Sequence, residues 1–112
     1  SKMKKETEEK KGQLQLLEQN LQNISAQKQN FQAQLIEIDN ALEELSKSKG
    51  KIYKIIGPVM ISSEKNDLEK DLNSKKEIIG LRVKNFEKQE NKLKEKFTET
   101  QEEVLKELKN KE

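Results

Sequence analysis

The middle of the chain reads Ile52-Tyr53-Lys54-Ile55-Ile56-Gly57-Pro58-Val59-Met60-Ile61. Its β-branched and aromatic residues are the types that strands favour, and Gly57-Pro58 interrupts the run. We therefore predict a strand over residues 51–56, a turn near 57–58 and a strand over 59–63. The type of this turn stays open, because proline at the second central position fits no primed two-residue hairpin.

This hairpin is expected to need partners. A lone two-stranded hairpin is marginal in water, and this one is apolar on both faces apart from Lys54. Its edges also carry unpaired N–H and C=O groups, which makes it an aggregation hazard unless another chain pairs with them. We expect oligomerisation into a closed β-barrel; the alternative is an apolar connector packed on its own helices. The residues assigned to assembly are Ile52, Tyr53, Ile55, Ile56, Gly57, Pro58, Val59, Met60 and Ile61.

The two flanks of the hairpin carry apolar residues at alternating steps of three and four. This period predicts the a/d seam of a left-handed coiled coil. We expect a mainly α fold in one domain, residues 1–112, with a long antiparallel helix pair over about 4–48 and 65–111 joined by the hairpin at 51–63. The predicted seam residues are Leu17, Leu21, Ile24, Phe31, Leu35, Ile38, Leu42, Leu72, Ile79, Val83, Phe86, Leu93 and Phe97.

Three residue-level predictions concern the two helices. Lys28 and Glu90 fall in neighbouring layers of the seam, so they can pair across it and fix the alignment of the helices. Asn66 with Glu69 three residues later resembles a capping box, which places the start of the second helix near Asn66. Gly80 costs that helix about 1 kcal/mol relative to alanine, a loss that burial of the seam must offset.

Composition excludes several classes of protein. Charged residues make up 39% of the 112 residues and aromatics 4%, too few large apolar groups for a compact core of normal depth. The net charge of +2 comes from interleaved signs, without the one-sided basic stripe of a nucleic-acid-binding coil. Without His or Cys, and without a phosphate-binding glycine loop, we expect no catalytic, metal or cofactor site. No segment is apolar enough to span a membrane, so we expect a soluble cytoplasmic protein.

The central run resembles the signature of β-class prefoldin subunits, which reads aliphatic-aromatic-Lys-aliphatic-aliphatic-Gly-Pro-Val-aliphatic-aliphatic. The similarity continues through Leu68, Leu72, Leu81-Arg82-Val83 and Phe86-Glu87-Lys88-Gln89-Glu90. Gly-Pro in the turn is most similar to eukaryotic subunit six, with the archaeal β subunit as the alternative. Ser62-Ser63, at the end of the second predicted strand, departs from the Lys-Gln-like pair that the family usually carries.

The resemblance implies a hetero-hexamer of two α-class and four β-class subunits. Hairpins would form its double β-barrel body, and the tips of the coiled coils would hold unfolded polypeptide without ATP and pass it to a group II cytosolic chaperonin. Actin and tubulin would be clients of a eukaryotic member. The alternative function is a structural coiled-coil adaptor or tether, for which the central run would be expendable.

Client contact is expected where the two chain ends meet. The seam turns polar there at Lys10 and Thr7, so we expect the helices to pack loosely. Flexible apolar groups in a polar surround suit weak contact with many unfolded chains, although frayed helix ends with incidental leucines are the alternative. The residues assigned to client contact are Met3, Leu14, Leu16, Val104, Leu105 and Leu108.

Overall fold

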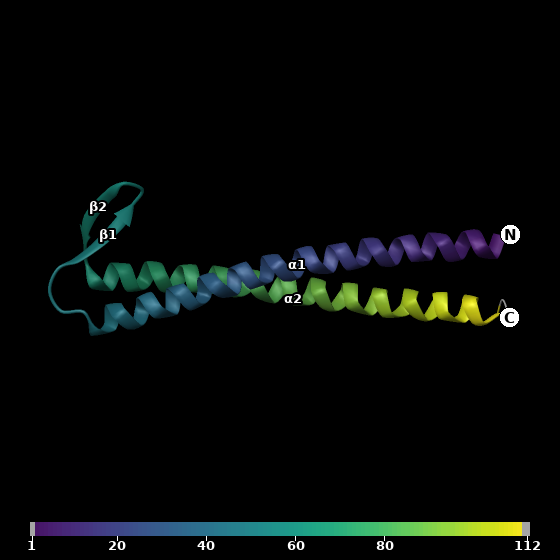
Figure 1. The fold of residues 1–112 in the computed structure, drawn as a ribbon. Helices are drawn as coiled ribbons and strands as arrows, with labels where there is room; N and C mark the ends of the chain where they lie inside the picture. Colours follow the sequence, from purple (N-terminus) through teal and green to yellow (C-terminus); the bar gives the residue numbers. More distant parts are fainter. Residues whose placement is uncertain (1, 111–112) are drawn as a thin grey trace. The chain divides into compact units, whose positions relative to one another are not determined.

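A computed structural model describes residues 2–110 of the chain. Four elements follow one another: helix α1 (Lys2–Lys47), strand β1 (Ile52–Ile56), strand β2 (Val59–Ser63) and helix α2 (Lys65–Asn110) (Figure 1). Two long helices joined by a hairpin are the fold class that the sequence predicts. Residues 1, 111 and 112, which the predicted elements or domain include, lie outside the described part of the chain.

The chain divides into two compact units. One contains the residues up to Lys28 and those from Lys84 onward, and the other is Gln29–Val83. In each unit a segment of α1 lies beside a segment of α2 that runs in the opposite direction (Figure 1). In the Gln29–Val83 unit, Lys76 Nζ lies 2.7 Å from Asp39 Oδ1, and the guanidinium of Arg82 lies 5.5 Å from the centre of the Phe31 ring.

The core of each unit is a single line of side chains along the seam. Each helix has only one neighbouring helix, so most seam residues are half-buried. Each predicted seam residue is buried or half-buried. The apolar side chains with the least exposure are Leu17, Leu45, Val83 and Val104.

Serine side chains and a glycine end helix α1. The hydroxyl of Ser46 donates a hydrogen bond to the carbonyl of Glu43 at 2.6 Å, and that of Ser48 donates to the carbonyl of Glu44 at 2.9 Å. Glu44 is one of the last four residues of the helix, whose carbonyls lack an intrahelical amide partner, so the Ser48 hydroxyl supplies one. Gly50 then takes a φ of +97°, a backbone conformation that other residues rarely adopt.

Helix α2 begins earlier than its capping-box pattern predicts. The carbonyl of Glu64 accepts the first helical hydrogen bond, from the amide of Leu68 at 3.0 Å, so Glu64 is the N-cap residue. Asn66 therefore lies inside the first turn, and the expected cap at this residue is wrong. Asp67 in the same turn is favourable beside the positive end of the helix dipole.

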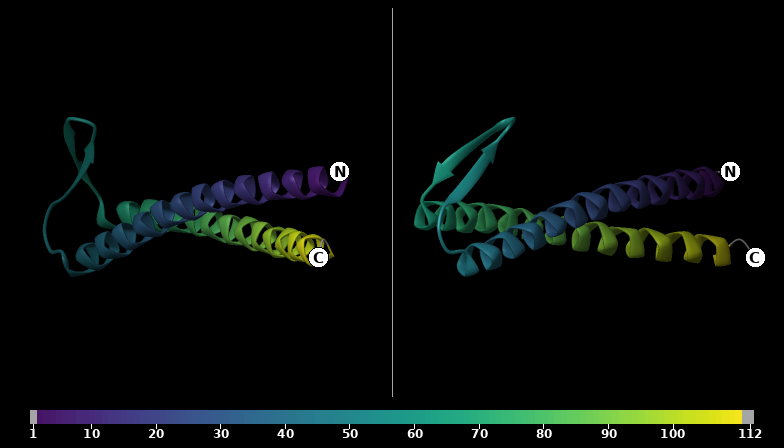
Figure 2. Two further views of the ribbon diagram at one scale, coloured as in Figure 1. Left: turned by 45° about the vertical axis from the view of Figure 1, so that its right-hand side comes forward. Right: turned by 60° about the vertical axis from the view of Figure 1, so that its left-hand side comes forward.

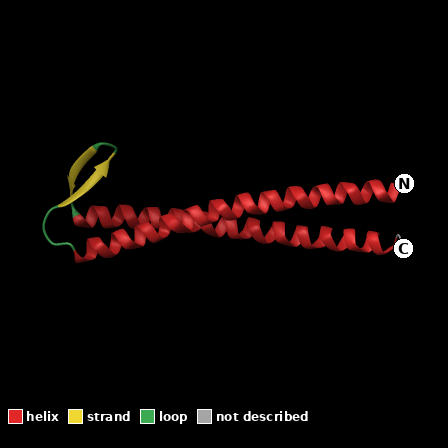
Figure 3. Ribbon diagram, in the orientation of Figure 1, coloured by secondary structure: helices red, strands yellow, loops and turns green. Residues whose placement is uncertain are grey.

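Strands β1 and β2 form an antiparallel ladder that runs from the pair Ile52 and Ser63 to the pair Ile56 and Val59 (Figure 3). In the Gln29–Val83 unit, this hairpin projects from the ends of the two helix segments in both views of Figure 2. Gly57 and Pro58 form the two-residue connection, and Gly57 has a φ of +56°.

The turn type follows from these angles. Of the two primed turns, type I′ requires positive φ at both central residues, which proline cannot adopt. Type II′ requires it only at the first, where Gly57 stands. The expectation that proline fits neither primed turn is therefore wrong, because the fixed negative φ of Pro58 suits the second position of type II′.

Candidate functional site

The hairpin presents apolar side chains on both of its faces. Successive residues of a strand point to opposite faces, so the paired Ile55 and Met60 share one face, and the paired Ile56 and Val59 share the other. Ile55 and Met60 are 70% and 64% exposed. Of the other residues assigned to assembly, Tyr53, Gly57, Pro58 and Ile61 are exposed and Ile52 is half-buried.

An ion pair links the hairpin to helix α2. The ammonium of Lys54 lies 3.4 Å from the carboxylate of Asp71, and Lys54 itself is half-buried. This exposed ion pair contributes little to stability, since such pairs are worth about 0–1 kcal/mol. The sheet has only two strands, so each strand also has one edge whose backbone groups lack a strand partner. A hairpin with this exposure favours association with other strands.

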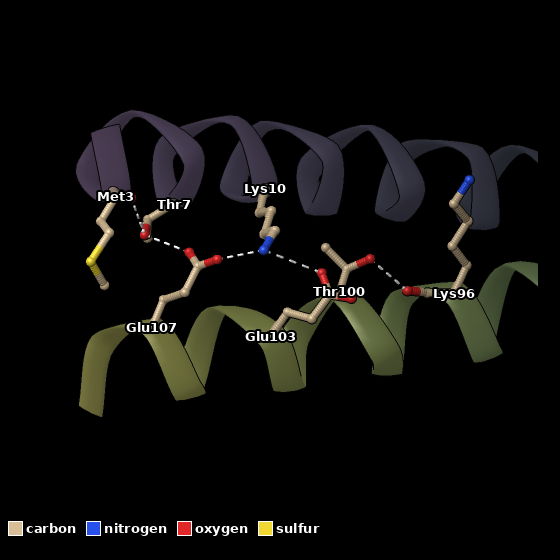
Figure 4. Close-up of polar contacts among 7 residues, drawn as sticks. All are labelled: Met3, Thr7, Lys10, Lys96, Thr100, Glu103 and Glu107. Carbon is tan, nitrogen blue, oxygen red and sulfur yellow. Dashed lines mark hydrogen bonds and ion pairs between the residues drawn. The ribbon is translucent and has the colours of Figure 1, made fainter. Parts of the chain in front are cut away.

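The second surface is the terminal end, which we define as residues 2–16 of α1 and 100–110 of α2. Here the seam continues with polar side chains (Figure 4). Thr7 is the most buried of them at 1% exposure; its hydroxyl contacts the carbonyl of Met3 at 2.9 Å and the carboxylate of Glu107 at 2.6 Å. The ammonium of Lys10 donates to the same carboxylate and lies 3.5 Å from Glu103. Thr100 is buried and donates to the carbonyl of Lys96 at 2.8 Å.

These contacts correct the expectation of loose helices at the terminal end. Lys10 and Thr7 do interrupt the apolar seam, but hydrogen bonds and ion pairs replace apolar contact there. The pKa of Lys10 is raised above its usual 10.5, because Glu107 accepts a hydrogen bond from the charged ammonium. We define Thr7, Lys10, Thr100, Glu103 and Glu107 as the polar layer.

Four of the six side chains assigned to client contact are exposed at the terminal end. Leu16 and Leu105 are 58% and 55% exposed, Met3 and Leu108 are also exposed, and Leu14 is half-buried in the seam. Val104 is the exception among the six residues assigned to client contact, because it is only 7% exposed. Its position in the seam accounts for its burial, so this side chain is not available to a client in this structure.

A second ion pair crosses the seam of the same unit. Lys28 Nζ lies 2.8 Å from Glu90 Oε1, which confirms the predicted pairing. Both side chains are largely shielded from water. The pKa of Glu90 is lowered from its usual 4.5, chiefly because Lys28 donates a hydrogen bond to the charged carboxylate.

Sequence reasoning missed two features of these surfaces. Glu107, which binds both Thr7 and Lys10, lies three residues after Val104, and continuing the seam by one more step of three would have identified it. Large apolar side chains are also exposed away from the chain ends, at Ile36, Ile78 and Leu81. Their exposure follows from positions off the a/d line, which the heptad pattern specifies.

Within residues 2–110, neither helix contains an apolar stretch long enough to cross a membrane. The same part of the chain holds no cluster of three or more His, Cys, Asp or Glu side chains suited to a metal ion.

Known proteins resemble this chain over most of its length. Residues 8–111 match the family described as "Prefoldin subunit". The prefoldin subunit beta of Archaeoglobus fulgidus is 39% identical over 94 residues, which cover 82% of this chain and 81% of the relative. That of Caldivirga maquilingensis is 34% identical over 93 residues, covering 81% and 77%. These relatives support the archaeal alternative of the two that the sequence raised.

Solved structures agree with this result. The crystal structure of the prefoldin beta subunit from Thermococcus strain KS-1 superposes with a TM-score of 0.84 at 31% identity, covering 88% of this chain and 89% of that one. The beta2 subunit of the same organism has a TM-score of 0.71 at 17% identity, with 78% and 95% covered. At that identity the second likeness concerns the fold alone.

Proposed function

The chain belongs to the prefoldin family of co-chaperones, and from this premise we propose that it is a β-type subunit of a hetero-hexamer that captures unfolded polypeptide. Capture requires no ATP, and the bound polypeptide passes to a group II chaperonin in the cytoplasm. Prefoldin subunits form hetero-oligomers with one another, so the partners of this chain are α-type and further β-type subunits. The relatives above are archaeal, and no particular client is assigned.

The exposed hairpin is the observation that carries this proposal. Ile55 and Met60 on one face, and Ile56 and Val59 on the other, leave apolar surface in water that a partner strand would cover. We assign assembly to this hairpin. Closure of several hairpins into a barrel would pair the free edges of both strands.

We assign client contact to the terminal end. Met3, Leu16, Leu105 and Leu108 are exposed beside the polar layer, which holds the two helices together without consuming these apolar groups. Single exposed leucines and a methionine give small contact areas, so each contact with a client is weak. Weak contacts to many sequences are suited to a protein that must release its client.

The test combines this chain with an α-type prefoldin subunit. We expect light scattering to give the mass of a hexamer, and the hexamer to suppress aggregation of a chemically unfolded protein in the absence of ATP. Adding a group II chaperonin should then release the client from the hexamer. A complex of the expected mass that fails to suppress aggregation would refute the capture function while leaving assembly intact.

A further inference from the structure

Helix α1 contains a long segment that is almost free of charge. Residues 12–36 hold only two charged side chains, Glu18 and Lys28, in a chain whose overall charged content is 39%. The same segment holds eleven Gln or Asn residues, which are not the strongest helix formers and play no part in the apolar seam. Neither assembly through the hairpin nor contact at the terminal end accounts for this composition.

The structure places part of this segment beside a groove in the unit that contains both chain ends. The groove has a volume of about 460 Å³ and lies between α1 and α2. Half-buried seam residues form its floor, and exposed residues, most of them amides, form its walls. The floor residues are Ile24 and Leu93, and the wall residues are Asn20, Asn23, Gln27, Gln89 and Lys92.

An extended polypeptide backbone matches the chemistry of this groove. Each Asn or Gln amide offers two donors and an acceptor, which are the complements of a peptide C=O and N–H. Ile24 and Leu93 offer apolar contact to a client side chain, and no carboxylate lines the groove to repel acidic segments. Folded proteins pair most of their backbone groups internally, so an unfolded segment presents many more of these groups to the groove.

The groove also continues the surface assigned to client contact. Leu16 is 58% exposed and lies four residues before Asn20, on the same face of α1. Resting on the proposed function, we propose that the groove holds the backbone of an extended client segment that continues from Leu16. Its amides recognise the peptide group and not the client sequence, and water competes for each hydrogen bond, so each contact is weak.

A second hollow on α1 serves as a matched control. Its lining residues are Gln15, Glu18, Gln19 and Gln22. Three of them are amides like those of the groove, but Glu18 adds a carboxylate and no apolar residue forms a floor. Helix geometry puts Gln22 and Asn23 on different faces, although they are neighbours in sequence. A site at Gln22 therefore tests whether any exposed amide on this helix contacts a client.

The first experiment places a diazirine photo-crosslinking side chain at Asn23, Gln22 or Leu105 of the full chain, assembled with an α-type prefoldin subunit. The probe is reduced, carboxymethylated α-lactalbumin, and the native form of the same protein is the folded control. We expect Leu105 and Asn23 to crosslink to the unfolded probe several-fold more than Gln22, and none of the three to crosslink to the native form.

The other possible outcomes distinguish a failure of the groove proposal from a failure of the proposed function. Crosslinks at Leu105, with Asn23 no higher than Gln22, would overturn the groove and leave capture at the terminal end. Absence of crosslinks at both Leu105 and Asn23 would overturn both. Crosslinks from Asn23 to a second copy of the chain instead of the probe would show that the groove is an interface between copies.

A second experiment distinguishes amide recognition from apolar contact. Replacing Asn23 and Gln27 together by leucine introduces a good helix former at both positions and removes the hydrogen-bonding groups. We expect affinity for the unfolded probe to fall by about three- to tenfold, as for the loss of one or two net hydrogen bonds. The control pair Gln19→Leu and Gln22→Leu, from the second hollow, should leave it unchanged. Tighter binding by the groove variant would mean that apolar contact alone determines affinity, and would overturn the proposal.

Discussion

The ammonium of Lys28 lies 2.8 Å from the carboxylate of Glu90 and joins the two helices at a point where the seam would otherwise hold apolar side chains. Removing one partner leaves the other charge unpaired and shielded from water, which is the costly case for a buried pair. Replacing both by leucine removes the charge and the alignment signal together.

We therefore expect Lys28→Leu to lower the free energy of unfolding by about 2–4 kcal/mol, and Lys28→Leu with Glu90→Leu to recover most of this loss. The double variant should lose its unique helix alignment. Chemical unfolding followed by circular dichroism measures the first effect, and distances between spin labels at Gln19 and Glu99 measure the second. An unchanged single distance in the double variant would discard the role in alignment.

The same pair predicts a dependence of stability on acid. The hydrogen bond from Lys28, with a smaller contribution from the charge of Lys94, lowers the pKa of Glu90 below 4.5, and partial burial opposes this shift without reversing it. A carboxylate whose pKa is lower in the folded state stabilises the fold above its unfolded pKa and loses this contribution as pH falls through the folded value. The free energy of unfolding should thus decline below about pH 4.5. Glu90→Gln should flatten that decline, measured by urea unfolding at a series of pH values; an equally steep decline in the variant would assign it to other carboxylates.

Charged substitutions in the hairpin should abolish assembly without affecting the helices. We expect Ile55→Lys with Val59→Asp to prevent hexamer formation with an α-type subunit, because burying either charge in a strand interface lacks a compensating partner. Light scattering measures the mass and circular dichroism the helicity, which should not change. Ile78→Lys, at an exposed residue of α2, is the matched control and should still assemble. Normal assembly of the hairpin variant would favour the tether, for which the central run is expendable.

Polar substitutions at the terminal end should reduce capture and not stability. Leu105→Ser with Leu108→Ser removes exposed apolar surface, so we expect weaker suppression of client aggregation and an unfolding free energy changed by less than about 1 kcal/mol. Leu81→Ser is the control, since Leu81 is equally exposed elsewhere on α2 and should leave capture intact. Val104→Ala should instead lower the free energy of unfolding by about 1–3 kcal/mol, because the Val104 side chain is buried. Equal loss of capture in the Leu81→Ser control would show that any exposed leucine contributes to capture, wherever it lies on the helix.

The sequence predicted the elements because each has a local signal. The alternating steps from Leu14 to Leu45 identify the seam, and Ile52 to Ile61 identifies the strands. Sequence reasoning failed at sites that residues from both helices form together. Thr7 and Lys10 read as weak points in an apolar seam, and only the position of Glu107 on the other helix shows that they are hydrogen-bonded. Asn20 and Gln27 likewise look like solvated surface until Leu93 and Lys92 of α2 complete a groove.

Two glycines allow a test of backbone effects alone. A Cβ added at Gly80 or at Gly57 would meet no atom within 4 Å, so neither substitution creates a clash. Gly80 lies inside α2, where alanine is the better helix former, and we expect Gly80→Ala to raise the free energy of unfolding by about 1 kcal/mol.

Gly57 has a φ of +56°, and a Cβ there costs about 1–2 kcal/mol. We expect Gly57→Ala to speed amide hydrogen exchange in β1 and β2 while the helices keep their exchange rates. Faster exchange throughout the helices would instead mean that the hairpin and the helices unfold as one unit.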